Sequence, residues 1–181
     1  LRTRLFWGDQ VQFSELFGMD YAESLEEAND ILDLSVEGSN RKGLAYQSML
    51  DRLYFEYASE KWEVRLGRQR INWGINTFWN PNDIFNAFTF TDFDYAERPG
   101  SDALRIRYFM NYASSIEIAA KAFDDFDEAV IAGLWKLNKA NYDFQILAGI
   151  MERDLVLGGG WAGNLNNAGF KGELSYFYSL E

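Results

Sequence analysis

The sequence contains no cysteine and no histidine. Without cysteine the chain forms no disulfide scaffold, no thiolate metal site and no cysteine nucleophile. Without histidine it lacks the base of Ser-His-Asp and Cys-His catalysis, the commonest zinc ligand and the usual pH-sensitive side chain. Most hydrolase mechanisms are thereby excluded. The sequence predicts no enzyme, and it predicts neither a metal nor another cofactor.

Positive charge, proline and long hydrophobic runs are also scarce. Lys and Arg number 17 against 28 Asp and Glu, for a net charge of −11, which argues against a nucleic-acid partner. The longest run without charged or strongly polar side chains is LVLGGGWAG, residues 155–163. A spanning helix needs about 18–20 apolar residues, so no transmembrane helix is predicted. No signal peptide is recognised, and we expect a mature form or a portion of a longer chain.

Hydrophobic and polar residues alternate along most of the chain, which is typical of β-strands whose two faces meet different environments. In residues 104–107, Leu104 and Ile106 alternate with Arg105 and Arg107. The same pattern occurs in residues 1–7, 31–38, 62–67, 115–122 and 170–178. Short turn-like segments separate the runs, at residues 38–43, 58–61, 110–113, 124–128 and 138–141. We expect an all-β protein of about nine or ten antiparallel strands joined as hairpins.

The polar face of these strands carries both signs of charge, while the apolar face is rich in aromatic rings. Aromatic residues make up 17% of the chain and charged residues 25%, which suits a thin wall that is apolar on one side and polar on the other. Many rings lie near predicted strand ends, where the membrane interfaces of a barrel would lie. They are Trp7, Trp62, Trp73, Tyr108, Tyr142, Tyr176 and Tyr178. We therefore expect one antiparallel, up-and-down transmembrane β-barrel domain, or a portion of one, over residues 1–181; a soluble β-sandwich is the alternative.

Residues 75–102 interrupt the alternation and form the longest predicted loop. They contain both prolines of the chain, Pro81 and Pro99, because proline cannot donate to a β-ladder and is confined to loops and edges. The loop is rich in aromatic residues, so we expect it to pack inside the barrel or over its mouth. A lid on a soluble core is the alternative. The residues predicted to form a constriction are Phe78, Trp79, Asn80, Asn82, Asp83, Phe85, Asp92 and Asp94.

Residues 53–88 and 94–109 resemble porin-like outer-membrane β-barrel proteins of Gram-negative bacteria. The resemblance rests on a strand ending Gly-Arg-Gln-Arg-Ile-Asn-Trp-Gly (67–74), the loop Asn-Pro-Asn-Asp (80–83) and Arg-Pro-Gly (98–100). Residues 168–177 look like a further strand of this family. Such barrels are usually much longer than this chain. The resemblance therefore implies a portion of a barrel in the bacterial outer membrane, in contact with lipid and lipopolysaccharide.

Arginine residues flank the long loop on both sides in the sequence. If the strands over residues 62–73 and 103–110 are neighbours, their guanidinium groups line the barrel interior beside the loop. There they would either favour anionic solutes or bind loop carboxylates and hold the loop in place. The residues predicted to line the pore are Arg65, Arg68, Arg70, Arg98, Arg105, Arg107, Glu117 and Lys121. Arg68 and Arg70 occupy the alternate positions that continue the face of Leu66, so charged side chains follow an apolar one there. This change in the pattern predicts a β-bulge near residues 67–69.

Two further motifs have simpler interpretations. Residues 158–163 satisfy the spacing Gly-x-Gly-x-x-Gly, but no helical period follows, so we expect a flexible hairpin connection rather than a dinucleotide site. The acidic residues 124–128 lack the spacing of a calcium loop, so a solvated turn is expected, with divalent-ion binding as the alternative. Nothing in the spacing of Asp92 and Asp94 favours acid–base catalysis on a sugar.

Together these observations predict a passive outer-membrane channel for small hydrophilic solutes, narrowed by residues 75–102 and by arginine side chains. A homo-oligomer is compatible with the sequence. Two alternatives stand beside this prediction. One is a soluble ligand-binding barrel or sandwich with residues 75–102 as its lid. The other is an outer-membrane barrel with a plugged interior and a structural or adhesive role.

Overall fold

The computed structural model describes residues 2–7, 32, 34–40, 44–76, 79–86, 100–123 and 129–180. Within these ranges the chain forms eleven β-strands, a short 3-10 helix and no α-helix. The predicted all-β class is confirmed, with slightly more strands than expected. The chain divides into two compact units, Leu1–Leu53 and Tyr54–Glu181, which are described separately. The single barrel domain expected over residues 1–181 stays a prediction.

The first unit contains a three-stranded antiparallel sheet of β1 (Arg2–Trp7), β2 (Ser35–Asn40) and β3 (Leu44–Met49). The strand order is β1-β3-β2, so β3 pairs on both edges. A contact between the hydroxyl oxygens of Thr3 and Ser48, 3.2 Å apart, accompanies the β1–β3 ladder. The strand expected over residues 31–38 starts only at Ser35. The irregular acidic stretch at residues 9–29 lies outside the described residues.

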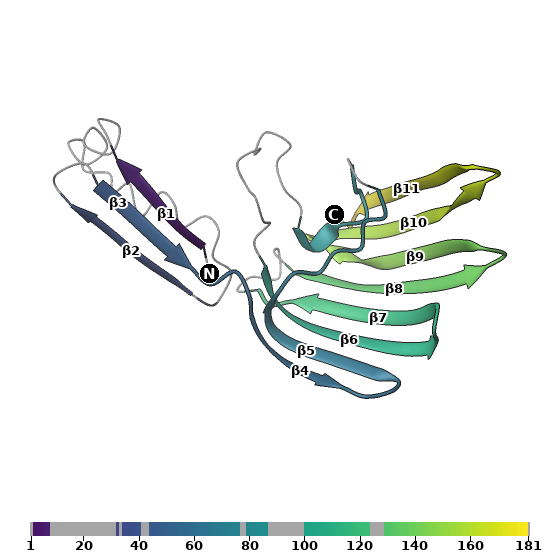
Figure 1. The fold of residues 1–181 in the computed structure, drawn as a ribbon, viewed down its shortest axis with the longest axis horizontal. Helices are drawn as coiled ribbons and strands as arrows, with labels where there is room; N and C mark the ends of the chain where they lie inside the picture. Colours follow the sequence, from purple (N-terminus) through teal and green to yellow (C-terminus); the bar gives the residue numbers. More distant parts are fainter. Residues whose placement is uncertain are drawn as a thin grey trace. The chain divides into compact units, whose positions relative to one another are not determined.

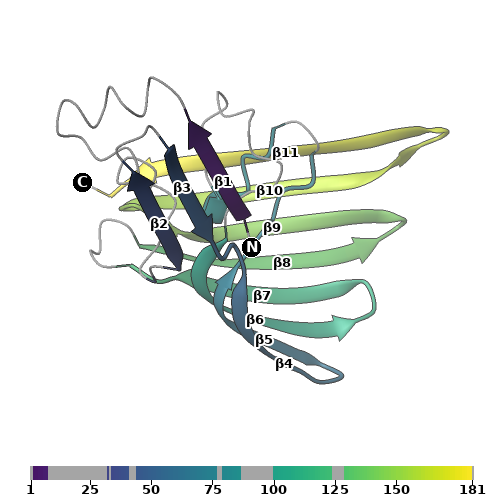
Figure 2. The ribbon, with the colours of Figure 1, turned by 60° about the vertical axis from the view of Figure 1, so that its left-hand side comes forward.

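The second unit contains an antiparallel sheet of eight strands in which each strand pairs with its neighbours in the sequence (Figures 1 and 2). The strands are β4 (Leu53–Ala58), β5 (Trp62–Gln69), β6 (Ser101–Asn111), β7 (Ser114–Lys121), β8 (Val130–Lys139), β9 (Tyr142–Met151), β10 (Asp154–Leu165) and β11 (Ala168–Ser179). This is an up-and-down order. In the described part of the chain the edge strands β4 and β11 are not paired with each other, so the sheet is open.

Tight turns connect the later strands. The β8–β9 turn places Ala140 and Asn141 at φ of 55° and 62°, and the β9–β10 turn places Glu152 and Arg153 at 50° and 72°. Positive φ at both central residues matches the right-handed twist of the strands that the turn connects. The turns predicted at residues 110–113 and 138–141 are confirmed, since turns centre on residues 112–113 and 140–141.

The β-bulge predicted near residues 67–69 is wrong. The β5–β6 register runs unbroken from Trp62 opposite Tyr108 to Gln69 opposite Ser101. Within β5, Gly67 has a positive φ of 121°, a value that glycine adopts readily because it has no Cβ. The register does shift in the β6–β7 pair, between Phe109 and Asn111.

Residues 70–100 form the insertion between β5 and β6, and their described parts are 70–76, 79–86 and 100. The 3-10 helix η2 (Ile84–Asn86) lies within it. Trp73, Ile84 and Phe85 of the insertion are buried in one cluster with residues of the sheet. The sheet residues of that cluster are Ala103, Ala119, Val130, Ala132, Leu134, Leu147 and Val156. The core of this unit therefore lies between the insertion and one face of the sheet, which we call the covered face.

Trp73 was expected at a strand end near a membrane interface, and this prediction is wrong. The residue lies outside the strands, is 2% exposed, and packs edge to face on Phe85 with ring centroids 4.8 Å apart. The alternation of strand side chains cannot describe a residue that lies beyond the end of its strand.

The opposite face of the eight-stranded sheet, which we call the open face, is apolar and exposed. Along β6 and β7, for example, Leu104, Ile116 and Ile118 are 39%, 42% and 56% exposed. Other large exposed side chains of this face include Trp62, Leu66, Ile131, Trp135, Phe144, Ile146, Ile150, Leu157, Phe170, Leu174, Tyr176 and Tyr178. Among the described residues there is no helix with the length and hydropathy to cross a membrane.

Candidate functional site

The covered face carries a cluster of charged side chains from four adjacent strands, which we call the charged cluster. Its members are Glu56 of β4, Glu63 and Arg65 of β5, Arg105 and Arg107 of β6, and Glu117 of β7. The register places Arg107 directly between Glu63 and Glu117. Side chains at alternate positions of a strand share a face, so the ladder brings these acids and bases together.

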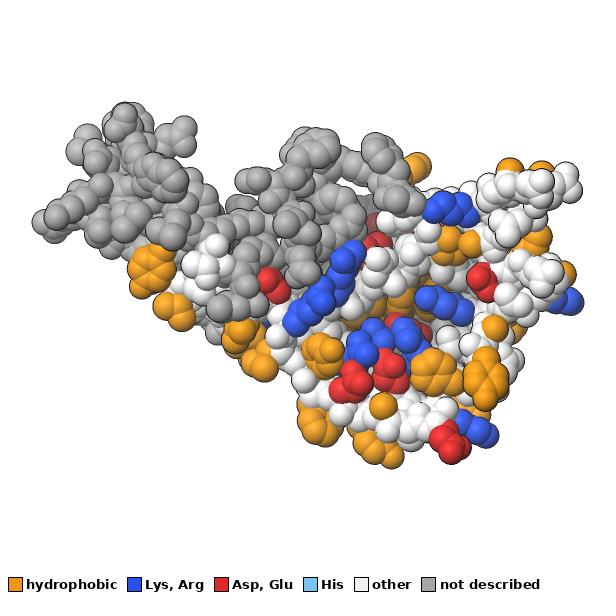
Figure 3. Space-filling view, in the orientation of Figure 1, with side chains coloured by type: hydrophobic (Ala, Val, Ile, Leu, Met, Phe, Trp, Pro, Cys, Tyr) orange, Lys and Arg blue, Asp and Glu red, His pale blue; other side chains and the backbone are white. Residues whose placement is uncertain are grey.

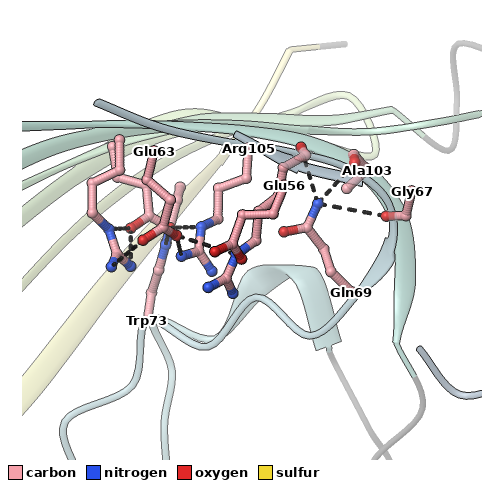
Figure 4. A network of polar contacts seen from close by, with 10 residues as sticks. Glu56, Glu63, Gly67, Gln69, Trp73, Ala103 and Arg105 are labelled. Carbon is pink, nitrogen blue, oxygen red and sulfur yellow. Dashed lines mark hydrogen bonds and ion pairs between the residues drawn. The ribbon is translucent and has the colours of Figure 1, made fainter. Parts of the chain in front are cut away.

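Short ion pairs connect the charged cluster (Figure 4). Arg105 Nη2 lies 2.5 Å from Glu63 Oε1, and Arg105 Nε lies 3.5 Å from Glu117 Oε1. Arg107 Nη2 lies 2.6 Å from Glu117 Oε2. Arg65 Nε completes the set, 2.6 Å from Glu56 Oε2. The space-filling view shows basic and acidic side chains side by side on this sheet (Figure 3).

Burial explains why these charges are paired. The side chains of Glu117 and Arg105 are 2% and 8% exposed, and an unpaired charge at such depth would cost several kcal/mol, by rough estimate. Among the described residues, Arg65, Arg105 and Arg107 all form ion pairs with glutamates of the strands. Within the described residues these arginines therefore form an ion-pair network and not a row of uncompensated positive charge.

A first anchor attaches the insertion to the middle of the covered face. Trp73 Nε1 donates a hydrogen bond to Glu117 Oε1 at 2.6 Å. Gln145 of β9, which is 3% exposed, donates from Nε2 to the carbonyl oxygen of Trp73 at 2.8 Å. The insertion is thus joined to β7 and β9, and Glu117 serves both the ion pairs and this anchor.

A second anchor attaches the insertion to β10 and β11 through Asn82, which is fully buried. Asn82 Nδ2 donates to the carbonyl oxygen of Gly159 at 3.0 Å. Ser175 Oγ donates to Asn82 Oδ1 at 2.7 Å. Both polar atoms of the amide are therefore bonded to the sheet, which a buried amide requires.

Glycines of β10 leave room for this anchor. A Cβ on Gly158 would lie 2.3 Å from Asn82 Oδ1, and a Cβ on Gly160 would lie 2.8 Å from Ile75 Cδ1. Both positions lack a side chain where the insertion approaches the strand. The prediction of a flexible hairpin connection at residues 158–163 is wrong, because these residues lie inside β10.

The remaining arginines and lysine of the predicted pore lining do not all join the charged cluster. Arg68 forms a bidentate salt bridge with Asp102, with Nε–Oδ1 and Nη2–Oδ2 distances of 3.0 and 2.9 Å. Arg70 is half-buried at the start of the insertion, and Lys121 is half-buried at the end of β7. Arg98 lies outside the described residues.

The predicted constriction residues divide into buried and exposed ones. Asn82, Asp83 and Phe85 are 0%, 6% and 4% exposed, whereas Trp79 is 62% exposed. Asn82 and Phe85 contact the sheet. Asn80 is half-buried. Phe78, Asp92 and Asp94 lie outside the described residues, as does the acidic segment 124–128. In the described ranges no group of three or more carboxylates is arranged to hold a metal ion.

Several residues of the site were not selected from the sequence as site residues. Glu56, Glu63 and Gln145 occupy polar positions of alternating strands, and that alternation was the available signal. The anchoring role of Trp73 had no local signal, because it depends on contacts between distant parts of the chain.

Comparisons with known proteins do not assign the chain to a family. No protein-family model, no curated protein and no solved structure matches it. Its function is therefore inferred from the distribution of polar and apolar side chains and from the position of the insertion.

Proposed function

We propose that the chain forms the wall of an outer-membrane β-barrel, and that its insertion narrows a channel for passive diffusion of small hydrophilic solutes. The observation that supports this most is the inverted polarity of the eight-stranded sheet. Charged Arg105 and Glu117 are 7% and 2% exposed on the covered face, while Ile118 and Leu174 are 56% and 58% exposed on the open face. Transmembrane barrels alternate in this way, with apolar side chains toward lipid and polar side chains toward the interior.

A water-soluble sheet would bury the opposite set of side chains. Each Å² of apolar surface left in water costs about 25 cal/mol, and soluble monomers rarely expose apolar patches larger than a few hundred Å², by rough survey. The open face of β5 to β11 presents large apolar side chains on every strand. Lipid hydrocarbon would remove this cost, because apolar side chains are as well solvated there as in a protein core.

Strand length is a second argument for a membrane wall. A transmembrane β-strand needs about 9–11 residues. Strands β6, β8, β9, β10 and β11 have 11, 10, 10, 12 and 12 residues. Their up-and-down order is the order of transmembrane barrels. The resemblance of residues 53–88 and 94–109 to porin-like proteins supports the outer membrane as the proposed location.

The covered face would line the channel and needs no covalent chemistry. Solutes would pass beside the charged cluster and the described parts of the insertion. Because Arg65, Arg105 and Arg107 already face glutamates, we expect selection mainly by the width of the channel. The channel should select only weakly for anionic solutes, because the glutamates compensate the positive charge of these arginines.

A second candidate is a barrel whose interior is plugged and whose role is structural or adhesive. The packing of the insertion favours it: Trp73, Ile84 and Phe85 are at most 4% exposed in the core against the sheet. This candidate shares the membrane wall with the first and differs only in whether solutes pass.

Electrical recording of the protein distinguishes the candidates. The protein is expressed from its full reading frame, folded in detergent and reconstituted in planar bilayers, together with a variant that lacks residues 78–96. The channel predicts discrete conductance steps that grow in the deletion variant. A folded wild-type protein without conductance, with a conducting deletion variant, would support the plugged barrel. A protein that is folded and monodisperse in buffer without detergent would contradict both.

A further inference from the structure

Glu173 of β11 binds the backbone of the insertion at two separate places. Its Oε1 accepts hydrogen bonds from the backbone N–H groups of Ile75 and Asn76. Its Oε2 faces the backbone N–H of Asn82 at 3.4 Å. One carboxylate therefore joins the stretch that follows Trp73 with the stretch that precedes η2.

The contacts between the Glu173 carboxylate and the backbone N–H groups are of a kind that can hold the insertion in place. Backbone N–H groups in a loop need acceptors when they leave water, and an ionised carboxylate accepts a hydrogen bond about twice as strongly as a neutral oxygen. The two side-chain hydrogen bonds of Asn82 with Gly159 and Ser175 lie beside the carboxylate. Gly160 provides room for the Ile75 side chain at the same place.

The two anchors use different strands and can be separated by mutation. The first anchor joins Trp73 to Glu117 and Gln145, on β7 and β9. The second joins residues 75, 76 and 82 to β10 and β11. Loss of Glu173 would therefore release the backbone of Ile75 and Asn76, while Trp73 and the Asn82 side chain stay attached to the sheet.

We propose that Glu173 is the positioning residue that holds the backbone of Ile75 and Asn76 beside Asn82 across the channel and so sets the width of the constriction. The effect of Glu173 on the width of the constriction rests on the proposed channel function. Its effect on the position of the insertion is independent of that function, so the two effects are tested by separate readouts. The solutes selected would be those smaller than the gap that the Glu173-bound insertion leaves.

The first readout is the accessibility of the anchored segment. The chain has no cysteine, so Ile75→Cys introduces a single thiol and keeps the backbone N–H that binds Glu173. Its reaction rate with a water-soluble maleimide is compared in proteins with Glu173, Glu173→Gln and Glu173→Ala. We expect Glu173→Ala to raise the rate by about tenfold or more, since loss of one charge-assisted hydrogen bond shifts an opening equilibrium by about this factor. Glu173→Gln keeps one acceptor oxygen without the charge and should fall between.

The second readout is single-channel conductance of the same Glu173 variants without the added cysteine. We expect larger conductance steps for Glu173→Ala than for the wild type. Glu60→Gln, an exposed glutamate of the β4–β5 hairpin, is the matched control and should change neither readout. Far-UV circular dichroism checks that the β-sheet is retained in each variant. If Glu173→Ala does not fold, Glu173→Gln carries the test in both readouts.

An unchanged labelling rate in a folded Glu173 variant would overturn the inference. Faster labelling with unchanged conductance would overturn the role in channel width and leave the anchor in place. Faster labelling in a protein that does not conduct at all would support the anchor, and only the proposed channel function would fail. Faster labelling with larger conductance steps would support the whole inference.

Discussion

The indole Nε1 of Trp73 donates a 2.6 Å hydrogen bond to Oε1 of Glu117, and Oε2 of the same carboxylate binds Arg107 at 2.6 Å. Trp73 belongs to the insertion and Glu117 to the sheet. The buried carboxylate therefore connects the ion pairs of the sheet with the segment that covers them. The charged cluster and the insertion should consequently respond together when either one is changed.

Trp73→Phe tests the hydrogen bond while keeping an aromatic ring in the core. We expect the free energy of unfolding to fall by about 1.5–3 kcal/mol, the usual value of a hydrogen bond to a charged group. The midpoint of urea unfolding in detergent measures this change. Trp135→Phe is the matched control, because Trp135 is 45% exposed on the open face, and its effect should stay within about 0.5 kcal/mol. If both substitutions lower the free energy of unfolding by the same amount, the Trp73 hydrogen bond does not contribute to stability.

Arg68→Met tests the buried pair with Asp102, whose side chains are 1% and 4% exposed. The substitution removes two charge-assisted hydrogen bonds from a buried carboxylate and should cost about 3–5 kcal/mol of unfolding free energy. Lys61→Met, on the exposed β4–β5 hairpin, should cost less than about 0.5 kcal/mol. The same urea titration measures both. A cost below 1 kcal/mol for Arg68→Met, roughly the value of a surface pair, would contradict a structural role for this pair.

Gly158→Ala tests the close approach of the insertion to β10. The new Cβ would lie 2.3 Å from Asn82 Oδ1, and Asn82 is held by Gly159 and Ser175, so the insertion must shift. We expect a loss of about 1–3 kcal/mol, the usual cost of overpacking, together with larger conductance steps. Gly133→Ala is the control in the same sheet, because its Cβ would meet its nearest atom only at 3.8 Å. Equal unfolding free energies and equal conductance steps in the two variants would argue against a tight contact at Gly158.

Much of the strand pattern of the second unit could be predicted from the sequence. Leu104, Ile106, Arg105 and Arg107 lie on the faces that alternation assigned to them, because side chains of a strand point to opposite sides in turn. Pairing of successive strands followed from short connections, as at residues 112–113 and 140–141.

Features that depend on distant contacts could not be predicted in this way. The partners of Arg65, Arg105 and Arg107 follow from the register of neighbouring strands, which alternation alone does not fix. The glycines at residues 158–160 led to the prediction of a hairpin connection, whereas they lie inside β10 and make room for Asn82. The pairing of β1 with β3 joins segments about forty residues apart, and alternation within each strand does not say which distant strand it pairs with.

Ile118→Lys places a charge on the open face of β7. In a lipid bilayer we expect the free energy of unfolding to fall by about 2–4 kcal/mol, as for a Lys on the lipid face of a transmembrane barrel near the bilayer midplane. Tyr112→Lys, in the fully exposed β6–β7 turn, should change it by less than about 0.5 kcal/mol. Urea unfolding in lipid vesicles measures both. A tolerated Lys at residue 118 would indicate that this position meets water.

The most direct measurement of the environment of the open face uses single nitroxide labels in the cysteine-free chain. Labels on Ile118→Cys and Ile146→Cys sample the open face, and a label on Tyr112→Cys samples the turn. Their collision rates with oxygen, which concentrates in hydrocarbon, and with a water-soluble nickel chelate are compared in reconstituted protein. If the open face meets lipid, oxygen should dominate at residues 118 and 146 and the nickel chelate at residue 112. Dominance of the nickel chelate at all three positions would contradict a lipid-facing open face.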